Sequence, residues 1–389
     1  MEKLLTLYIN LNIILMRNTL ILLISFLLFS CTQNKVEDEK VLQVTLEETP
    51  VSVKDLFSSV EVIPLETNDS CLLARITRIR EVNGNFYLLS EDYPVFQHIA
   101  LMMFDGEGHF VRSIGKVGQG PEEYPWLIYD AAIDADKQLA YMMSPAGSIY
   151  IYHLDGSFVR KMAMPQKMNY QRLDVLDGNT LLGWSALEED ESSVTLAKAD
   201  SGTLVNEFWK DEFELNWDCH EPFYQYDNET YFASAHRRKV YRVTKDSLAL
   251  AYQWDFGKDN IDIEKQCASL SDDRQAASEE WRRKKDDGSI PYFISMHGQT
   301  SKYYYACLFH DIKNMYNLFY EKKTGKALYF KETTEGIDLS PQLITNEYML
   351  MLVNTESLEK LAPVLGEKEY AKIADRVEDE NPCLVKFLF

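Results

Sequence analysis

The sequence has little positive charge for its size. Its 389 residues include 40 Lys and Arg against 61 Asp and Glu, which gives a formal net charge of -21. A surface of this sign repels a nucleic acid backbone, and no local basic patch offsets it, so nucleic acid is excluded as a partner. The hydrophobic content of 46% and the aromatic content of 12% indicate a globular chain with a large core.

The sequence also lacks the local motifs of common enzymes and metal sites. It contains no G-x-S-x-G, H-E-x-x-H or EF-hand loop, and its seven His residues show no ligand spacing. The segment GKVGQG is not a phosphate loop, because the GK[ST] ending is absent. No C-x-x-C or Cys/His pair indicates zinc, and every Cys except Cys31 is expected to be a buried small hydrophobic residue.

A hydrophobic run long enough to cross a bilayer is missing from the apolar N-terminus. The run from Leu20 to Phe29 has about ten residues, whereas a spanning helix needs roughly 20. With Arg17 before it, this length is typical of the hydrophobic region of a signal peptide. The sequence Ser30-Cys31 that follows is similar to the bacterial lipobox, in which the lipidated Cys becomes the mature N-terminus. A transmembrane anchor with an unrelated Cys is the alternative.

We therefore expect residues 1–30 to be a lipoprotein signal peptide, with Met16 as its natural start, and Cys31 to carry the lipid that anchors the protein in a membrane. Residues 31–41 are polar and acidic, as in a flexible tether. Acidic residues just after the lipidated Cys resemble the surface-export signal of Bacteroidetes lipoproteins. The expected location is the outer membrane or the cell surface.

Residues 42–389 contain a repeat of about 46 residues. The turn glycines Gly108, Gly156 and Gly202 are 48 and 46 residues apart. Each repeat holds two β-hairpins, and four antiparallel strands per unit are typical of a propeller blade. The inner strand pairs are expected at residues 75–90, 129–143, 171–184, 223–235 and 302–318. The outer pairs are expected at residues 101–115, 149–162, 194–209, 239–257 and 317–331.

Both ends of the chain supply a sixth blade. Residues 343–354 provide its inner strands, 383–389 its third strand and 60–66 its fourth. Closing the ring in this way removes the open sheet edge, and a seventh blade would need about 46 further residues. The predicted fold is thus an all-β, six-bladed β-propeller of four-stranded antiparallel blades. Helical insertions are expected near residues 261–285 and 356–377.

Several segments carry a family resemblance. VEVIPLET at residues 60–67, the hairpin FDGEGHFV at 104–111, GKVGQGPEEY at 115–124 and NPCLV at 381–385 resemble the six-bladed β-propeller lipoproteins of Bacteroidetes, which are relatives of NHL-repeat propellers. The resemblance covers nearly all of the mature chain. It implies the propeller fold and a surface or outer-membrane location, and it leaves the molecular activity undefined.

Candidate ligand-binding residues lie in the connections between blades and at the strand starts beside them, which meet around the mouth of the central channel. These connections are expected at residues 116–127, 163–170, 210–222, 258–300 and 332–342. Long loops on a rigid scaffold concentrate binding residues, and Trp and Tyr suit stacking against sugar rings or peptide side chains. The candidates are Glu122, Glu123, Tyr124, Trp126, Tyr170, Arg172, Trp217, His220 and His297. For each aromatic residue, packing between blades is the alternative.

The leading hypothesis is a surface-anchored binding or interaction module that uses this loop face to hold a glycan, a peptide or a partner envelope protein. The alternative is a propeller enzyme of the lactonase, lyase or glycosidase type with a divalent metal on the channel axis. Asp130 and Asp174 on inner strands are available for such a site, whose ligands would lie about one blade apart and leave no local motif. A purely structural envelope component is the third hypothesis. No cofactor and no catalytic residue are assigned.

Replacing Cys31 with Ser should release the protein from the membrane fraction, because the lipid is attached through the thiol. Fractionation of cells followed by immunoblotting measures the release. A variant that sediments with membranes as the wild type does would show that the lipobox interpretation is wrong.

Overall fold

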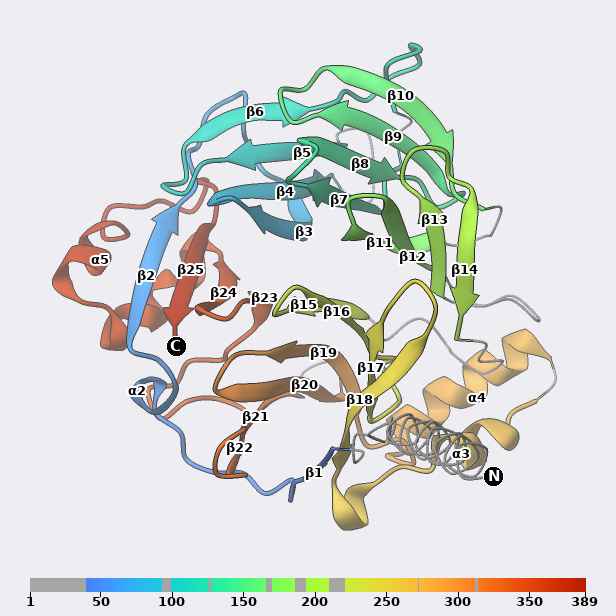
Figure 1. The fold of residues 1–389 in the computed structure, drawn as a ribbon. Coiled ribbons are helices and arrows are strands. Elements are labelled where there is room, and N and C mark those ends of the chain that lie inside the picture. The colour runs from blue at the N-terminus through green and yellow to red at the C-terminus, as the bar shows by residue number, and fades with distance from the viewer. Residues whose placement is uncertain are drawn as a thin grey trace, which may run out of the picture. The chain divides into compact units, whose positions relative to one another are not determined.

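Six antiparallel sheets surround a central channel in the computed structural model (Figure 1). Each sheet is a blade that runs from an innermost strand at the channel to an outermost strand at the rim. The fold is therefore the predicted six-bladed β-propeller. The structure describes residues 40–92, 99–124, 127–165, 170–185, 194–209, 221–271, 273–311 and 314–389. Within these ranges no helix is long and apolar enough to span a membrane.

In blades 1 to 5 the four strands follow one another in the chain, from the channel outward. Blade 1 consists of β3 (Arg75–Val82), β4 (Asn85–Glu91), β5 (Ile99–Phe104) and β6 (Phe110–Ile114). Blade 2 consists of β7 (Asp130–Asp134), β8 (Leu139–Met143), β9 (Ser148–His153) and β10 (Phe158–Ala163). Blade 3 consists of β11 (Tyr170–Asp177), β12 (Thr180–Ser185), β13 (Val194–Lys198) and β14 (Leu204–Phe208). Blade 4 consists of β15 (Phe223–Tyr226), β16 (Glu229–Phe232), β17 (Lys239–Val243) and β18 (Leu248–Asp255). Blade 5 consists of β19 (Phe293–Gln299), β20 (Tyr303–Asp311), β21 (Asn314–Glu321) and β22 (Ala327–Phe330).

Blade 6 joins the two ends of the described chain. Its inner strands β23 (Pro341–Ile344) and β24 (Tyr348–Val353) are followed by β25 (Cys383–Leu388), which pairs with β2 (Ser59–Pro64) from the N-terminal part of the chain. The antiparallel register runs from Ser59 opposite Leu388 to Pro64 opposite Cys383. The predicted closure of the ring is confirmed, and it leaves β2 as the outermost strand of the last blade.

The inner half of blade 5 differs from the sequence prediction. The pattern assigns residues 258–300 to a connection and 302–318 to the two inner strands. The first assignment is wrong at its end, because residues 293–299 form the innermost strand β19. The two strands predicted within residues 302–318 are the middle strands of the blade, β20 and β21, instead of its two inner strands. The polar residues Ser295 and His297 weaken the apolar signal of β19, although both are buried.

Strands in the middle of a blade are buried on both faces, because each sheet packs between two neighbouring sheets. All six residues of β12 are buried, so this strand is a nearly continuous apolar run instead of an alternating one. Tight turns connect such strands where the sequence predicts them. Asn83 and Gly84 both have positive φ, as do Asp227 and Asn228, which suits the twist of a β-hairpin.

The segment before β2 crosses the outer edges of three blades and is called the strap, residues 41–58. Its strand β1 (Val41–Gln43) pairs in parallel with β18 of blade 4. Further along, the Thr49 backbone N–H donates to the Tyr329 carbonyl of blade 5 at 2.8 Å. The short helix α2 (Val53–Leu56) then leads into blade 6, and Figure 1 shows this path along the rim. The sequence pattern does not predict β1, which is only three residues long.

Helices occupy two connections. Between β18 and β19 lie η1 (Gly257–Asp259), α3 (Ile263–Ala268) and α4 (Arg274–Asp286), where Trp281 packs in a small apolar cluster with Ile263 and Ile290. Between β24 and β25 lie the 3-10 helix η2 (Thr355–Val364), which contains Pro363, and α5 (Glu367–Ala371). Leu358 and Leu361 of η2 are buried in the core shared by blades 5 and 6.

Gly108→Ala should destabilise the fold more than Gly84→Ala. Both residues are turn glycines of blade 1 with positive φ, which costs an L-residue about 1 kcal/mol. Only at Gly108 would the new Cβ also lie 2.2 Å from the carbonyl oxygen of Pro64 in the closing strand. In denaturant titrations we expect the free energy of unfolding to fall by about 1 kcal/mol for Gly84→Ala and by about 2–4 kcal/mol for Gly108→Ala. Equal losses would show that the closing strand does not constrain this turn.

Candidate site in the central channel

The channel holds two pockets, one at each end. The mouth pocket has a volume of about 600 Å³, and the early residues of the inner strands line it, such as Arg75–Ile79 of β3 and Arg172 of β11. The far pocket has a volume of about 330 Å³, and later residues of the same strands line it, such as Arg80–Val82 of β3 and Asp174 of β11. The described ends of three connections between blades line the mouth pocket, with Ile128 and Tyr129 before β7, Glu221 before β15 and Ser340 before β23. Three residues line both pockets and separate them: Glu221, Met296 and Gln342.

Four of the six inner strands change register at the level of the mouth pocket. The shifts fall between Ile76 and Arg78, Tyr170 and Arg172, Ile294 and Met296, and Pro341 and Leu343. The extra residues at these shifts are Thr77, Gln171, Ser295 and Gln342, and all four line the pocket. Such irregularities re-aim side chains and are common beside functional sites. The repeated shift therefore marks this end of the channel as the candidate site.

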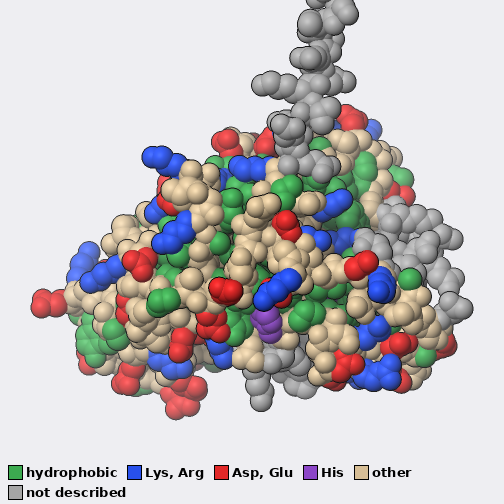
Figure 2. Space-filling view, turned by 90° about the horizontal axis from the view of Figure 1, so that it is seen from below, with side chains coloured by type: hydrophobic (Ala, Val, Ile, Leu, Met, Phe, Trp, Pro, Cys, Tyr) green, Lys and Arg blue, Asp and Glu red, His purple; other side chains and the backbone are tan. Residues whose placement is uncertain are grey.

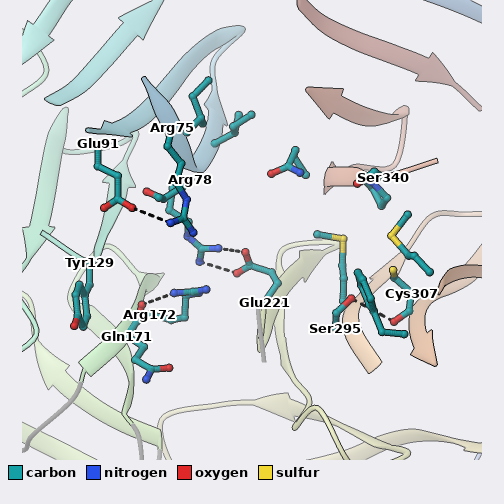
Figure 3. A pocket seen from close by; sticks show the side chains of 18 of the residues that line it. Arg75, Arg78, Glu91, Tyr129, Gln171, Arg172, Glu221, Ser295, Cys307 and Ser340 are labelled. Atoms are coloured by element: carbon teal, nitrogen blue, oxygen red, sulfur yellow. Dashed lines mark hydrogen bonds and ion pairs between the residues drawn. The ribbon is translucent and has the colours of Figure 1, made fainter. Parts of the chain in front are cut away.

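Arg78 lies between two carboxylates on the channel axis. Its Nε donates to Asp130 Oδ1 at 2.8 Å and its Nη2 to Asp130 Oδ2 at 3.1 Å. On its other side Nη2 donates to Glu221 Oε1 at 2.8 Å, and Nη1 also pairs with the Glu221 carboxylate (Figure 3). Arg78 is 7% exposed, and the burial of its charge is compensated by these two partners. Burial disfavours the charged guanidinium, but the two carboxylates outweigh it and raise the pKa of Arg78.

Asp130 is fully buried and connects three blades. Its carboxylate accepts the backbone N–H of Ala131 in its own blade at 2.8 Å and that of Leu173 in blade 3 at 2.9 Å, and Arg78 reaches it from blade 1. Arg80 of blade 1 lies 3.6 Å away. Burial alone would raise the pKa of Asp130, but the guanidinium groups of Arg78 and Arg80 hold it below its usual value. Asp130 is therefore an ionised structural anchor for the two arginines.

The mouth pocket has a charged side and an apolar side. On the charged side Arg75 lies 3.7 Å from Glu91, and Arg172 Nη1 donates to the Gln171 carbonyl at 2.8 Å (Figure 3). The apolar side comes from blade 5 and consists of Met296, Cys307, Phe309 and Met315. Burial raises the pKa of the Cys307 thiol to about 12, so this sulfur is a neutral part of the wall. A ligand with an anionic end and an apolar or ring-shaped body matches both sides.

Two of the predicted site residues line the channel. Arg172 lines the mouth pocket, and His297 lines the far pocket from strand β19. His297 is 3% exposed, and burial lowers its pKa to about 3, so the imidazole is neutral. Whether either residue contacts a ligand stays a prediction.

Four further predicted residues line neither pocket: Glu122, Glu123 and Tyr124 lie in the connection between blades 1 and 2, and Tyr170, which was expected in a connection, is the first residue of β11. The Glu123 carboxylate accepts the Gly120 N–H at 2.8 Å and pairs with Lys116, within its own loop. The carbonyl of the exposed Glu122 accepts the Tyr152 hydroxyl. Tyr124 and Tyr170 are buried, and their hydroxyls donate to the carbonyls of Ile99 and Pro165. Tyr124 packs between blades 1 and 2 and Tyr170 between blades 2 and 3, which is the alternative stated above for the aromatic residues.

The remaining predicted residues, Trp126, Trp217 and His220, lie outside the described residues. The aromatic part of the predicted loop face is therefore described only through Tyr124 and Tyr170.

The carboxylates on the axis are arranged for pairing with arginine. Among the described residues no group of three or more His, Cys, Asp or Glu side chains could hold a metal ion. Asp130, which the sequence offers as a metal ligand, is bound by Arg78, and Asp174 accepts the N–H of Val175 at 2.8 Å. Both carboxylates thus already have partners within the protein.

Sequence reasoning missed the arginines of β3 and their partner Glu221. The signal is present in the strand itself, where Arg75, Arg78 and Arg80 interrupt an otherwise apolar pattern. Charged residues at positions that a blade buries indicate paired groups. The partners cannot be found locally, because Asp130 is 52 residues and Glu221 143 residues from Arg78.

These features define the molecule as a closed six-bladed propeller with a polar axial pocket. The chain belongs to the family described as domain of unknown function DUF4934, whose family model matches residues 40–387. The solved structure of a Bacteroides fragilis protein classed as exported is similar, with a TM-score of 0.70 and 18% identity, and the match covers 89% of this chain and 99% of that chain. The structure of a member of the duf4221 family from Bacteroides vulgatus has a TM-score of 0.51 and 11% identity, and the match covers 86% of this chain and 97% of that chain. At these identities the likeness shows the fold alone. No curated protein matches the sequence.

Asp130→Asn should lower the free energy of unfolding at neutral pH by about 3 kcal/mol, because it removes a charged partner from the buried Arg78. Asp177→Asn is the control, since it breaks a half-exposed ion pair with Lys245 and should cost less than about 1 kcal/mol.

The cost of Asp130→Asn should also depend on pH. A carboxyl with a lowered native pKa contributes stability that is fully present above its unfolded pKa of about 3.9 and is lost as the pH falls through the native pKa. The difference in the free energy of unfolding between wild type and variant, measured by denaturant titration, should therefore become smaller as the pH is lowered. A difference that is independent of pH would contradict the assignment of Asp130 as an ionised anchor.

Proposed function

We propose that this protein is an exported, lipid-anchored binding module whose mouth pocket holds the carboxylate group of a glycan or a peptide. The observation that carries the proposal is the meeting of three guanidinium groups, those of Arg75, Arg78 and Arg172, in one pocket of a chain with a net charge of -21. Over the described part of the face seen in Figure 2, side chains of both signs are interspersed. The pocket lining thus holds one more cation than carboxylates in a chain whose overall composition is acidic.

The chemistry of the pocket supports a carboxylate ligand. A guanidinium presents parallel N–H donors that match the two oxygens of a carboxylate. The volume of about 600 Å³ is within the range of small-molecule sites and accommodates a short oligosaccharide end or a few peptide residues. The apolar wall of Met296, Phe309 and Met315 supplies a surface for a sugar ring or an apolar side chain.

The position of the strap agrees with an anchor at Cys31. Strand β1 lies at the outer edge of blade 4, so the described chain enters the ring there. The similarity to a Bacteroides fragilis protein classed as exported supports export of this chain. In this proposal the lipid holds the ring at the outer membrane, and the pocket captures ligand there.

Ligand arrays test the proposal with matched acidic and neutral glycans and with peptides that carry a free or an amidated C-terminus. We expect acidic members to bind and their neutral partners to bind at least about tenfold more weakly, because hydrogen bonds to charged groups contribute roughly 1.5–3 kcal/mol. Whichever acidic class binds identifies the source of the carboxylate. Arg172→Gln should weaken this binding by about tenfold, and Arg112→Gln, on the exposed strand β6, should leave it unchanged. Equal binding of acidic and neutral members, or of wild type and Arg172→Gln, would contradict the proposal.

A further inference from the structure

The two ends of the channel differ in charge. The mouth pocket is lined by Arg75, Arg78 and Arg172 against Glu91 and Glu221. The charged residues that line the far pocket are one cation and four carboxylates, namely Arg80, Glu81, Asp174, Glu221 and Asp227. Glu221 is already paired with Arg78, and Arg80 donates to the carbonyls of Ala131 and Leu173. The far pocket thus keeps an excess of negative charge.

Among these carboxylates, Asp174 is the one whose charged form is disfavoured both by burial and by neighbouring negative charges. Burial raises its pKa, Arg80 opposes that effect, and the nearby Glu221 and Asp130 raise the pKa further. Its Oδ1 accepts the backbone N–H of Val175 at 2.8 Å, and the Gln225 amide lies 3.5 Å away. A positive group placed beside Asp174 would offset both the desolvation and the repulsion.

His297 provides a second, independent observation. It is 97% buried, since 3% of it is exposed, and among the described residues its Nε2 has no hydrogen-bond partner. A buried polar atom without a partner is costly unless something bonds to it. His297 lines the far pocket and is neutral, so its ring offers a lone pair there without adding positive charge.

An aromatic wall beside the pocket already binds an ammonium group of the protein. Lys322 Nζ lies 4.1 Å from the ring centroid of Tyr226, a lining residue, and 4.5 Å from that of Tyr304. The same ammonium donates to Gln299 Oε1 at 3.1 Å. Tyr224, another lining residue, stacks on Tyr231 with ring centroids 5.0 Å apart. Lys322 occupies these ring faces, which shows that the surroundings of the far pocket accept an ammonium group.

We propose that the far pocket is a second binding site, which takes an organic ammonium group, with Asp174 as its counter-ion and His297 Nε2 as a hydrogen-bond acceptor. A lysine side chain and an amino sugar both carry such a group. This site is separate from the mouth pocket and does not depend on the function proposed for that pocket.

The test uses butylamine and its uncharged analogue butanol, with binding to the full-length protein followed by NMR. We expect butylamine to bind in the millimolar range, as befits so small a ligand, to shift the ring signals of His297, and to bind at least about tenfold more tightly than butanol. Asp174→Asn should weaken butylamine binding by about tenfold, and Asp69→Asn, which changes an exposed carboxylate outside the channel, should not. Arg172→Gln should leave it unchanged, which separates this site from the mouth pocket.

Equal binding of butylamine and butanol to the wild type, or no butylamine binding at millimolar concentrations, would overturn the proposal whether or not the variants fold. Unchanged butylamine binding in an Asp174→Asn protein that melts as the wild type does would also overturn it. Glucosamine and Nα-acetyl-lysine amide then distinguish the two sources of the ammonium group, and the tighter ligand identifies the natural class.

Discussion

The interaction on which the channel depends is the pairing of Arg78 with the buried carboxylate of Asp130. A guanidinium at the axis of a propeller loses most of its hydration, and only a fixed opposite charge makes that position tolerable. Backbone N–H groups of Ala131 and Leu173 hold the carboxylate, so blades 1, 2 and 3 meet at one point. The other side of Arg78 then faces Glu221 and the mouth pocket. The guanidinium group that Arg78 presents to the mouth pocket is thus held in place by the buried carboxylate of Asp130 behind it.

Much of the ring could be predicted because its signals are local. Turn residues such as Asn83-Gly84 have positive φ, as their type predicts, and the spacing of the turn glycines gives the number of blades. Strand β19 was missed because it follows two helices in a long connection and because the polar residues Ser295 and His297 weaken its apolar signal. The strap was missed because three residues of β1 carry no periodic pattern, and their place is decided by a neighbour, β18, more than 200 positions away.

The site was predicted less well, for a physical reason. Tyrosine suits both a binding surface and the contact between two blades, and residue type does not separate these roles for Tyr124 and Tyr170. The arginines of β3 look like solvent-facing positions of an edge strand until their partners in other blades are known. Arg172 was found because it lies where a connection enters a strand, beside the register shift at Gln171.

The closing strand has a consequence for the order in which the protein can be completed. β2 is made long before its pairing partner β25, and the bond from Ser58 to Leu388 joins residues 330 positions apart. Until β25 has been made, β2 has no strand to pair with and the outer half of blade 6 cannot form. Contacts at such separation form slowly, so the newly made chain must be kept from aggregating while the residues between β2 and β25 are synthesised.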